Sequence, residues 1–562
     1  MELSYIYDTD VLVIGGGGAG IKAAIKAGEQ GVSVLLCTKY KLGFSGASFY
    51  PGMDGWGINA ITHRRLGDSE DNFYDEILSA GAGAVDKKLA RVLVEQCTPA
   101  FRELEDYGIQ FDKDENGEYN SVISCFGKRV RGANAKLGDI KQALWRQLMK
   151  NGVQIRSGIS VVSLVMKDGV CCGALGFDEL EQLAFFRAKS TVLATGGGCG
   201  LYRYSLSTPD QTGDGYIMAL DCGARLVNLE FLQFIPGLTW PVPKLLFQEK
   251  NLDTLPKVTN RTGREFLYDY LPEGVSLERC LVERARSGPF SHVGDGRYFD
   301  IALYEEWLKG NVKDNGGIHM QYDKRVLEDR RWPIVTWLEW MQSRGVHPTE
   351  EGFDMIPHAQ CFNGGIYIDV DAGTGIPGLF AAGETAGGPH GADRLGGNAQ
   401  AATQVFGNIA GVSAALFAKE TTLTDIGETQ LLGQLRDRFD RGAGGLVEIE
   451  DQMREVREIM WTCGAVVRSE ERCREGIARL SRLEERFNPY EHFATHTDVR
   501  RTAGLYSYLK LSQLMLRIME QRKESRGPHF RADYPETNPE FEGSMIAQRD
   551  GEEIKLTLKR QD

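Results

Sequence analysis

Three glycines near the start of the chain have the spacing of a phosphate-binding loop. Gly15, Gly17 and Gly20 fit the pattern GxGxxG. In such a loop the first glycine permits a tight turn, the second lets the backbone approach a pyrophosphate, and the third lets a helix pack closely on a strand. The start of that helix then presents free N–H groups to the negative charge. The spacing therefore predicts a site for a dinucleotide cofactor.

The segments around these glycines are those of a nucleotide-binding unit. Asp10–Ile14 is an apolar run typical of a buried strand, Ile21–Gln30 is predicted to be a helix, and Val32–Leu36 a second strand. A glycine-rich turn without a ligand is the alternative, and the strand–turn–helix order disfavours it. Thr38 and Lys39 follow the second strand, where many dinucleotide folds place an acid for the ribose hydroxyls. Their presence disfavours a plain NAD site.

Charge and cysteine content narrow the classes of function. The chain of 562 residues has a formal net charge of −13, which argues against general binding to nucleic acid or anionic membranes, since both need a basic face. We find no run of about 18 apolar residues and expect no membrane span. The 11 cysteines are scattered without CxxC or C-x-H spacing. We therefore expect no disulfide scaffold, no metal site, no iron–sulfur cluster in this chain, and a cytoplasmic location.

After the nucleotide unit the chain continues with helical and strand-like segments. Helices are predicted over 69–109 and 138–151. Residues 153–187 alternate like an antiparallel meander, with Asp168-Gly169 as a hairpin turn. A buried strand that ends in glycines is predicted over 190–198.

The middle of the chain interrupts this pattern. Residues 236–349 are rich in Trp, Pro and charged residues, with helices predicted near 276–286 and 301–310. A strand-like segment then resumes the nucleotide fold and a long helix follows over 399–419. Residues 427–525 are charged and predicted to be helical.

Motifs spread along the chain point to one family. GGGGAG, ATGGG, TGDGYIMAL, GLFAAGE and GADRLGGN follow one another in this order, and ESRGPHFRADYP lies near the end. With them the chain resembles the flavoprotein superfamily of succinate dehydrogenase, fumarate reductase, L-aspartate oxidase and the adenylylsulfate reductase alpha subunit. The resemblance implies an α/β fold with a Rossmann-like FAD-binding domain of the glutathione reductase type at 1–235 and 350–425. It also implies an inserted α+β capping domain at 236–349 and a C-terminal helical domain with a tail at 426–562.

The resemblance implies which residues hold an extended FAD. Gly15, Gly17 and Gly20 would line the pyrophosphate, Thr38 and Lys39 would lie near the adenosine ribose, and Glu384 would meet ribityl or ribose hydroxyls. The other implied cofactor residues are Ser45, Gly57, Asn59, Thr195, Gly196, Gly197, Asp214, Gly383, Asn398 and Ala399. The helix that starts at the last two would face the flavin pyrimidine edge and favour the anionic reduced flavin.

Two departures from the family pattern concern the cofactor and the substrate. Membrane-linked members attach FAD through a His, but the matching stretch here is Ser45-Gly46-Ala47-Ser48, so we expect non-covalent FAD. Dicarboxylate reducers hold their substrate with a His in Phe-His-Pro-Thr and another in His-Tyr-x-Met-Gly-Gly. Here these stretches contain Ile235 and Gln360 instead. We therefore expect an organic anion that is larger or less charged than succinate, fumarate or L-aspartate.

Four residues are the candidates for catalysis. Arg394 matches the family and can bind one anionic group through its guanidinium fork. Gln360 and His358 lie in the stretch that carries a substrate histidine in the family, and Arg297 is a candidate for the proton-donating arginine. A packing role for His358 and a surface ion pair for Arg297 are the competing interpretations.

Three functions are compatible with this pattern. The leading one is reduction or oxidation of a C–C bond beside a carbonyl, by hydride transfer at flavin N5, with electrons from a separate partner. In the family that partner is often an iron–sulfur subunit. The alternatives are sulfur chemistry of the adenylylsulfate reductase type, and a flavin electron-transfer subunit whose own catalytic site has changed.

Overall fold

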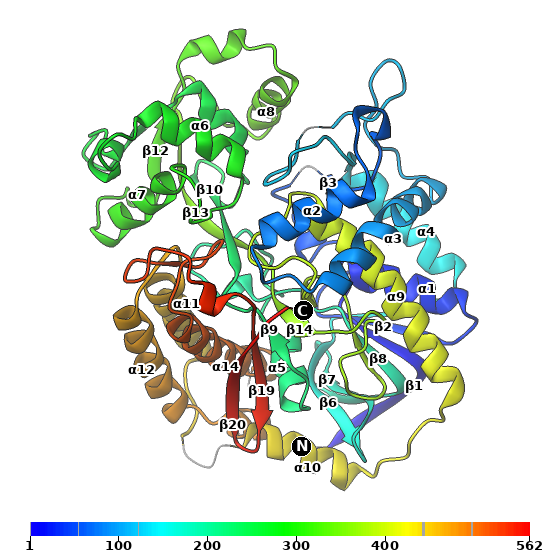
Figure 1. Ribbon diagram of the computed structural model, residues 1–562. Helices are drawn as coiled ribbons and strands as arrows, with labels where there is room; N and C mark the ends of the chain where they lie inside the picture. The colour runs from blue at the N-terminus through cyan, green and yellow to red at the C-terminus, as the bar shows by residue number, and fades with distance from the viewer. Residues whose placement is uncertain (1, 54, 122, 441–443, 496–497, 562) are drawn as a thin grey trace.

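A seven-stranded mixed sheet, seen at the lower right of Figure 1, carries the nucleotide unit. The computed structural model describes residues 2–53, 55–121, 123–440, 444–495 and 498–561. Strand β1 (Leu3–Ile14) pairs in parallel with β2 (Val34–Thr38) on one side and with β8 (Leu183–Leu193) on the other. Its last residues are fully buried because they lie inside the sheet, as their apolar sequence predicts.

Two helices in backbone contact cover this sheet. Helix α1 (Gly18–Glu29) starts in the glycine loop, and α9 (Asn398–Glu420) lies against it. A Cβ atom at Gly407 would lie 2.8 Å from the carbonyl oxygen of Ala19, and one at Gly411 would lie 2.3 Å from that of Ala23. Glycines four residues apart thus allow the close contact. Helix α9 is long and apolar enough to cross a membrane, but 67% of its most apolar window is buried inside the protein.

The predicted meander is largely confirmed. Strands β6 (Ser160–Lys167) and β7 (Val170–Phe177) form a hairpin that continues antiparallel into β8. Asp168 and Gly169 have φ of 51° and 78°, the positive values that a tight hairpin turn requires. The prediction is wrong for β5 (Gln154–Ser157), which pairs in parallel with β2 at the sheet edge.

The helices predicted over residues 69–109 and 138–151 are present. Residues 69–109 form two helices, α2 (Glu70–Gly81) and α3 (Lys87–Asp106), instead of one. Ala82, with a φ of 48°, separates them. Helix α4 (Leu137–Lys150) matches its predicted range closely.

A second lobe stands above the nucleotide unit (Figure 1). Its sheet has the order β10-β13-β12-β11. Strands β10 (Leu232–Trp240) and β13 (Phe353–Phe362) are its longest and connect it to the body of the molecule. The other elements are β11 (Lys257–Thr259), β12 (Ile318–Gln321), α6 (Leu277–Ser287), α7 (Arg297–Leu308) and α8 (Trp332–Ser343). The domain bounds given above stay a prediction.

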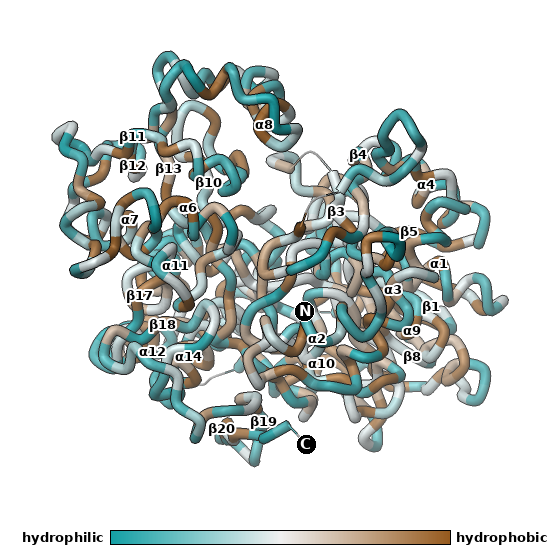
Figure 2. The backbone as a smooth tube through the Cα atoms, turned by 45° about the horizontal axis from the view of Figure 1, so that its top comes forward, coloured by the Kyte–Doolittle hydropathy of each residue, from teal (hydrophilic) through white to brown (hydrophobic). Residues whose placement is uncertain are grey.

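The C-terminal part is helical, as predicted, but it ends in a hairpin that was not predicted. The helices are α10 (Glu428–Phe439), α11 (Ile449–Gly464), α12 (Glu470–Arg486), α13 (Pro489–Ala494) and α14 (Val499–Gln521). Strands β19 (Ser544–Asp550) and β20 (Glu553–Lys559) then join β9 (Leu226–Val227) in a five-stranded sheet. The outermost loops are largely hydrophilic (Figure 2).

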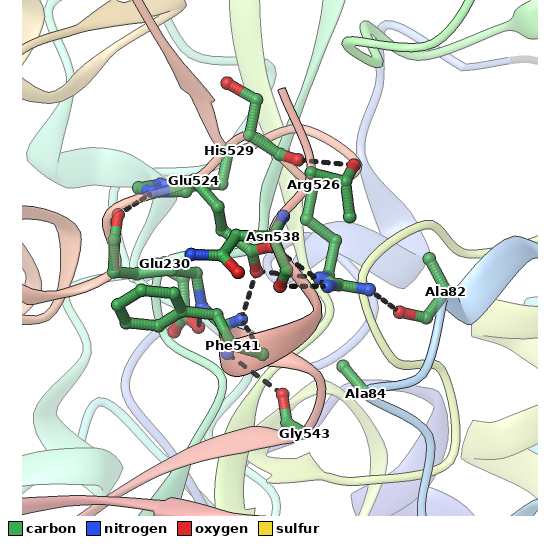
Figure 3. Close-up of polar contacts among 12 residues, drawn as sticks. Ala82, Ala84, Glu230, Glu524, Arg526, His529, Asn538, Phe541 and Gly543 are labelled. Carbon is green, nitrogen blue, oxygen red and sulfur yellow. Dashed lines mark hydrogen bonds and ion pairs between the residues drawn. The ribbon is translucent and has the colours of Figure 1, made fainter. Parts of the chain in front are cut away.

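A buried cluster of charges ties the C-terminal segment to the rest of the chain (Figure 3). Arg522 contacts Glu230 and Glu524, each at 2.7 Å, and Arg526 contacts Glu524, also at 2.7 Å. Arg526 also donates to the carbonyl oxygen of Ala82, between α2 and α3. The four charged side chains are almost fully buried, so each depends on its partners for the hydrogen bonds that water would otherwise supply.

We expect Glu524→Gln to destabilise the protein by about 3–5 kcal/mol, because it leaves buried arginines without full charge compensation. Urea denaturation followed by circular dichroism measures the change. Glu118→Gln is the control: Glu118 pairs with Arg65 on the surface, and we expect a change within about 0.5 kcal/mol. Equal stability of the two variants would contradict the structural role of the cluster.

Candidate functional site

One cavity of about 320 Å³ connects the glycine loop with Arg394. Its wall contains Gly15 to Ala19, the loop Ser45 to Ser48, and residues as far along the chain as Thr403. Most of the predicted cofactor residues lie on this wall: Gly15, Gly17, Thr38, Lys39, Ser45, Gly57, Thr195, Gly196, Asp214, Gly383, Glu384 and Ala399. The structure therefore brings residues together that are up to about 380 positions apart in the sequence.

The glycine loop has the close contacts that its spacing predicts. Gly15 has a φ of +112°, and a Cβ atom there would lie 2.1 Å from the carbonyl oxygen of Ala194 at the end of β8. A Cβ atom at Gly20 would lie 1.8 Å from the carbonyl oxygen of Gly15. Both contacts are possible only for glycine, and they place the first turn of α1 beside the cavity. A helix start in this position suits a pyrophosphate.

A partly buried ion pair lies where the adenosine is expected. Lys39 contacts Asp214, and its Nζ donates to Thr212 Oγ1 at 2.8 Å. Burial alone would raise the pKa of Asp214, but the charge and the hydrogen bond of Lys39 lower it. Among the described residues, the second carboxylate oxygen of Asp214 has no hydrogen-bond partner. It is therefore able to accept a hydrogen bond from a cofactor hydroxyl or amino group.

Glu384 lines the cavity between the glycine loop and Arg394. Its Oε1 accepts a hydrogen bond from the backbone N–H of Phe362 at 2.9 Å. Burial raises the pKa of Glu384 to about 7, so the carboxyl group is only partly ionised near neutral pH. Hydroxyl groups of a bound cofactor would stabilise the ionised form by donating to it. Gly197 lies directly behind, since a Cβ atom there would be 2.4 Å from Glu384 Oε1.

Asn59 and Asn398 hold the start of α9. The Asn59 side-chain amide donates to Asn398 Oδ1 at 2.7 Å and to the carbonyl oxygen of Gly396 at 2.6 Å. These contacts fix the first turn of α9, whose residue Ala399 lines the cavity. The unpartnered oxygen of Asp214, the glycine contacts and the two helix starts together fit an extended FAD.

The far end of the cavity is built around Arg394. This residue is 6% exposed, and its Nη1 donates to the carbonyl oxygen of Leu395 at 3.0 Å. Within the described part of the chain, Arg394 Nε and His390 Nδ1 have no hydrogen-bond partner. His390 is 8% exposed, and burial, together with the charge of Arg394, lowers its pKa to about 3. The pair offers a bound anion one guanidinium and one neutral imidazole.

Gln360 reaches the cavity because of a β-bulge. In the pairing of β10 with β13, Gln233 faces Cys361 and the next residue, Phe234, faces Ala359. Gln360 is thus the extra residue on β13, and such a bulge changes the direction of a side chain. Its side-chain oxygen is unpartnered among the described residues and the residue lines the cavity.

The two other predicted catalytic residues lie elsewhere. The His358 ring contacts the carbonyl oxygen of Ile356 through Nδ1 at 2.8 Å and packs edge-on against Tyr204. Burial lowers the pKa of His358 to about 4. Arg297 donates from Nη1 to the carbonyl oxygen of His292 at 2.6 Å. The structure thus brings Arg394 and Gln360 to the described cavity wall, but not His358 or Arg297.

His390 was missed at the level of sequence. It lies in the segment GGPHGADRLGGN, four residues before Arg394. Glycine-rich loops have no hydrophobic period that would indicate which side chains face inward. The sequence feature that could have indicated His390 is its position between two glycine runs, close to Arg394.

Comparison with known proteins agrees with this geometry. Residues 10–399 match the family model described as FAD binding domain, and residues 453–561 match the one described as fumarate reductase flavoprotein C-term. The chain is 32% identical to one of the subunits of fumarate reductase (CoM/CoB) from Methanothermobacter marburgensis, over 97% of this chain and 98% of that protein. It is 28% identical to L-aspartate oxidase of Yersinia pestis, over 95% and 98% of the two chains.

Solved structures show the same architecture. Quinol fumarate reductase of E. coli superposes with a TM-score of 0.80 at 26% identity, covering 99% of this chain and 97% of that one. Adenylylsulfate reductase of Archaeoglobus fulgidus superposes with a TM-score of 0.73 at 18% identity, covering 99% and 96%. At that lower identity the likeness concerns the fold alone.

We expect Gly20→Ala to lose FAD, because the added Cβ atom would collide with the Gly15 carbonyl group and displace the start of α1. The ratio of flavin to protein absorbance after purification measures the loss. Gly138→Ala is the matched control, since nothing lies within 4 Å of a Cβ atom at Gly138 in α4. If the Gly20 variant keeps its full content of flavin, the cavity is not the cofactor site.

We also expect the cofactor-free protein to lose stability as the pH rises from about 4.5 to about 7, because burial holds the pKa of Glu384 at about 7, above its ordinary value of 4.5. In this window the folded state binds more protons than the unfolded state, so raising the pH favours unfolding. Glu384→Gln should make the thermal midpoint less dependent on pH in the same window. A slope remains in the variant, because burial also raises the pKa of Asp393 to about 7. An identical slope in both proteins would contradict the assignment to Glu384.

Proposed function

Because the chain belongs to the fumarate reductase flavoprotein family of FAD-dependent oxidoreductases, we propose that it reduces, or in reverse oxidises, a carbon–carbon bond beside the carbonyl group of an organic anion. FAD, when bound, supplies or accepts the hydride. The observation that carries the proposal is the pair of buried, unpartnered groups at the far end of the cofactor cavity, Arg394 Nε and His390 Nδ1.

We propose that these two groups bind and orient the substrate. A carboxylate accepts hydrogen bonds from the Arg394 guanidinium, which remains charged at any pH in the cell. Gln360 lies on the same wall and can donate to a carbonyl or carboxylate oxygen. Positive charge beside the carbonyl group stabilises the negative charge that develops there when hydride reaches the β-carbon.

The described wall favours a substrate with one anionic group. Its charged members are Lys39, Asp210, Asp214, Glu384 and Arg394. Lys39 is already paired with Asp214, so Arg394 is the cation left for a substrate among these described residues. Ile235, Cys361 and Phe362 lie on the same wall and make the substrate end more apolar. We therefore propose a larger enoate or enone with one carboxylate, in preference to a dicarboxylate.

We propose that electrons reach the site from a separate iron–sulfur partner and that the protein works in the cytoplasm. The support for a partner is that the relative in Methanothermobacter marburgensis is named as one of the subunits of its enzyme. The support for the location is that all 11 cysteines are free thiols, which suits a reducing compartment. NADH-driven turnover by the isolated chain at the full rate would contradict the need for a partner.

We propose that the FAD is held without a covalent bond. The stretch Ser45-Gly46-Ala47-Ser48 lines the cavity and contains no imidazole for attachment. Acid precipitation should therefore leave the whole flavin content in the supernatant, as measured by its absorbance. Flavin that remains with the precipitated protein would show attachment through another side chain.

Anaerobic reoxidation of the reduced enzyme tests the reaction. Fumarate, adenylylsulfate and a series of larger enoates and enones are added one at a time, and the return of the oxidised flavin band is followed. We expect fast reoxidation by a monocarboxylate enoate, and a loss of about 2–4 kcal/mol of transition-state stabilisation in Arg394→Met, because one oriented donor is removed. Fast reoxidation by fumarate would contradict the single-anion proposal. Release of sulfite from adenylylsulfate would instead support sulfur chemistry, and no response to any compound would favour an electron-transfer subunit with an altered site.

A further inference from the structure

A thiol lies on the wall of the substrate end of the cavity. Cys125 lines this cavity together with Arg394, His390 and Gly396. Its carbonyl oxygen accepts a hydrogen bond from the backbone N–H of Gly396 at 3.1 Å. The Cys125 loop is thus attached to the segment that carries Arg394. The thiol therefore has a fixed position beside the place where an anion would bind.

A buried carboxylate contacts this thiol from the upper lobe. Cys125 Sγ donates to Oε1 of Glu249 at 3.2 Å, and Glu249 is 6% exposed. Gly288 closes over the pair, since a Cβ atom there would lie 2.3 Å from Cys125 Sγ and 3.4 Å from Glu249 Oε1. The backbone at Gly288 has a φ of +79°, which favours glycine. The contact between the Cys125 thiol and the Glu249 carboxylate therefore requires glycine at position 288, because any side chain there would collide with the sulfur.

Burial, together with the Glu249 carboxylate, keeps the thiol protonated. Burial raises the pKa of Cys125 to about 12, and the negative charge of Glu249 adds to the effect, while Lys250 and Arg394 oppose it. Arg284 lies close enough for its charge to act on both Glu249 and Cys125, and it is itself paired with Asp300. A thiol in this environment keeps its proton at neutral pH until a stronger base appears in the cavity.

We propose that Cys125 is the proton donor of the reaction and that Glu249 is the positioning residue that returns a proton to it. The inference rests on the proposed function. As hydride from the reduced cofactor forms the new C–H bond at the β-carbon, the S–H bond of Cys125 breaks and its proton forms the C–H bond at the α-carbon. The Glu249 carboxylate then relays a proton from solvent to the sulfur, which restores the S–H bond. One hydride and one proton are consumed per double bond, and Glu249 is again a carboxylate at the end of the cycle.

The other candidates for this role are less suitable. His390 shares the cavity wall, but with its pKa lowered to about 3 the ring is neutral and a poor acid. The side chains of His358 and Arg297 contact backbone carbonyl groups away from the described wall. The Cys125 thiol, in contrast, lies on the wall and has a buried carboxylate within hydrogen-bond distance.

Stopped-flow kinetics of the FAD-loaded protein test the proposal. With a reoxidising enoate from the panel above, Cys125→Ala should slow flavin reoxidation by about 10²–10⁴-fold, the range of general acid catalysis. Reduction by dithionite and reoxidation by ferricyanide need no proton donor and should keep their rates. Glu249→Gln keeps the hydrogen bond but cannot pass on a proton, so it should slow turnover and enlarge the solvent deuterium isotope effect. Cys125→Ser should recover part of the lost rate.

Cys222→Ala is the matched control, because this thiol is also partly buried and its pKa is also raised to about 12, but it lies outside the described cavity wall. Its reoxidation rate should equal that of the unaltered protein. The infrared S–H band of Cys125 gives a readout without turnover and should shift in Glu249→Gln. If Cys125→Ala is reoxidised at the unaltered rate, or the band does not shift, the proposal is overturned while the proposed function stands. If no enoate or enone reoxidises the unaltered protein, both are overturned.

Discussion

Backbone contact at glycine positions is the constraint on which the site depends. Gly20 lets α1 rest against the Gly15 carbonyl group, and this contact sets where the helix start points. Gly407 and Gly411 bring α9 into the same kind of contact with α1. Since α9 starts at Asn398, four residues after Arg394, the pyrophosphate end and the substrate end of the cavity are fixed to one rigid pair of helices. A change of a few tenths of an ångström at one end would therefore be transmitted to the other.

The substrate end is supported from two directions. The upper lobe contributes Ser291, whose hydroxyl donates to Asp393 Oδ2 at 2.6 Å, directly before Arg394. The C-terminal segment packs behind the same loop, because a Cβ atom at Gly527 would lie 2.9 Å from the Cβ atom of Ala392. The buried cluster of Glu230, Arg522 and Glu524 holds that segment. Charges far from the cavity thus help to keep the guanidinium in position.

Features that depend on residues close together in the sequence could be predicted, whereas features that depend on contacts between distant segments could not. The glycine loop, its flanking strands and helices, and the Asp168-Gly169 hairpin follow local rules, and the structure confirms them. The β19–β20 hairpin was missed although Asp550-Gly551 at its turn is a local hairpin signal. Only its pairing with β9, more than 300 residues earlier, lies beyond any local pattern. Gln360 reaches the cavity through a bulge, whereas His358, two residues before it, does not, and the bulge is a property of strand pairing. Family motifs indicated Arg394, but Glu249 and Cys125 come from unrelated segments and meet only in the folded chain.

The free-energy cost of an unpartnered buried donor explains why the cavity is built for an anion. A buried polar group without a hydrogen bond costs about 1–3 kcal/mol, and more when it is charged. Arg394 Nε is such a group within the described structure, and a carboxylate would satisfy it while adding a charge-assisted bond. The neutral His390 beside it accepts or donates without adding a second positive charge. A second carboxylate would meet Ile235, Cys361 and Phe362 and would lose its hydration without a partner. The wall thus favours a substrate with one negative charge. The Cys125 thiol beside it keeps its proton until the α-carbon of the substrate becomes strongly basic, as it does when hydride reaches the β-carbon.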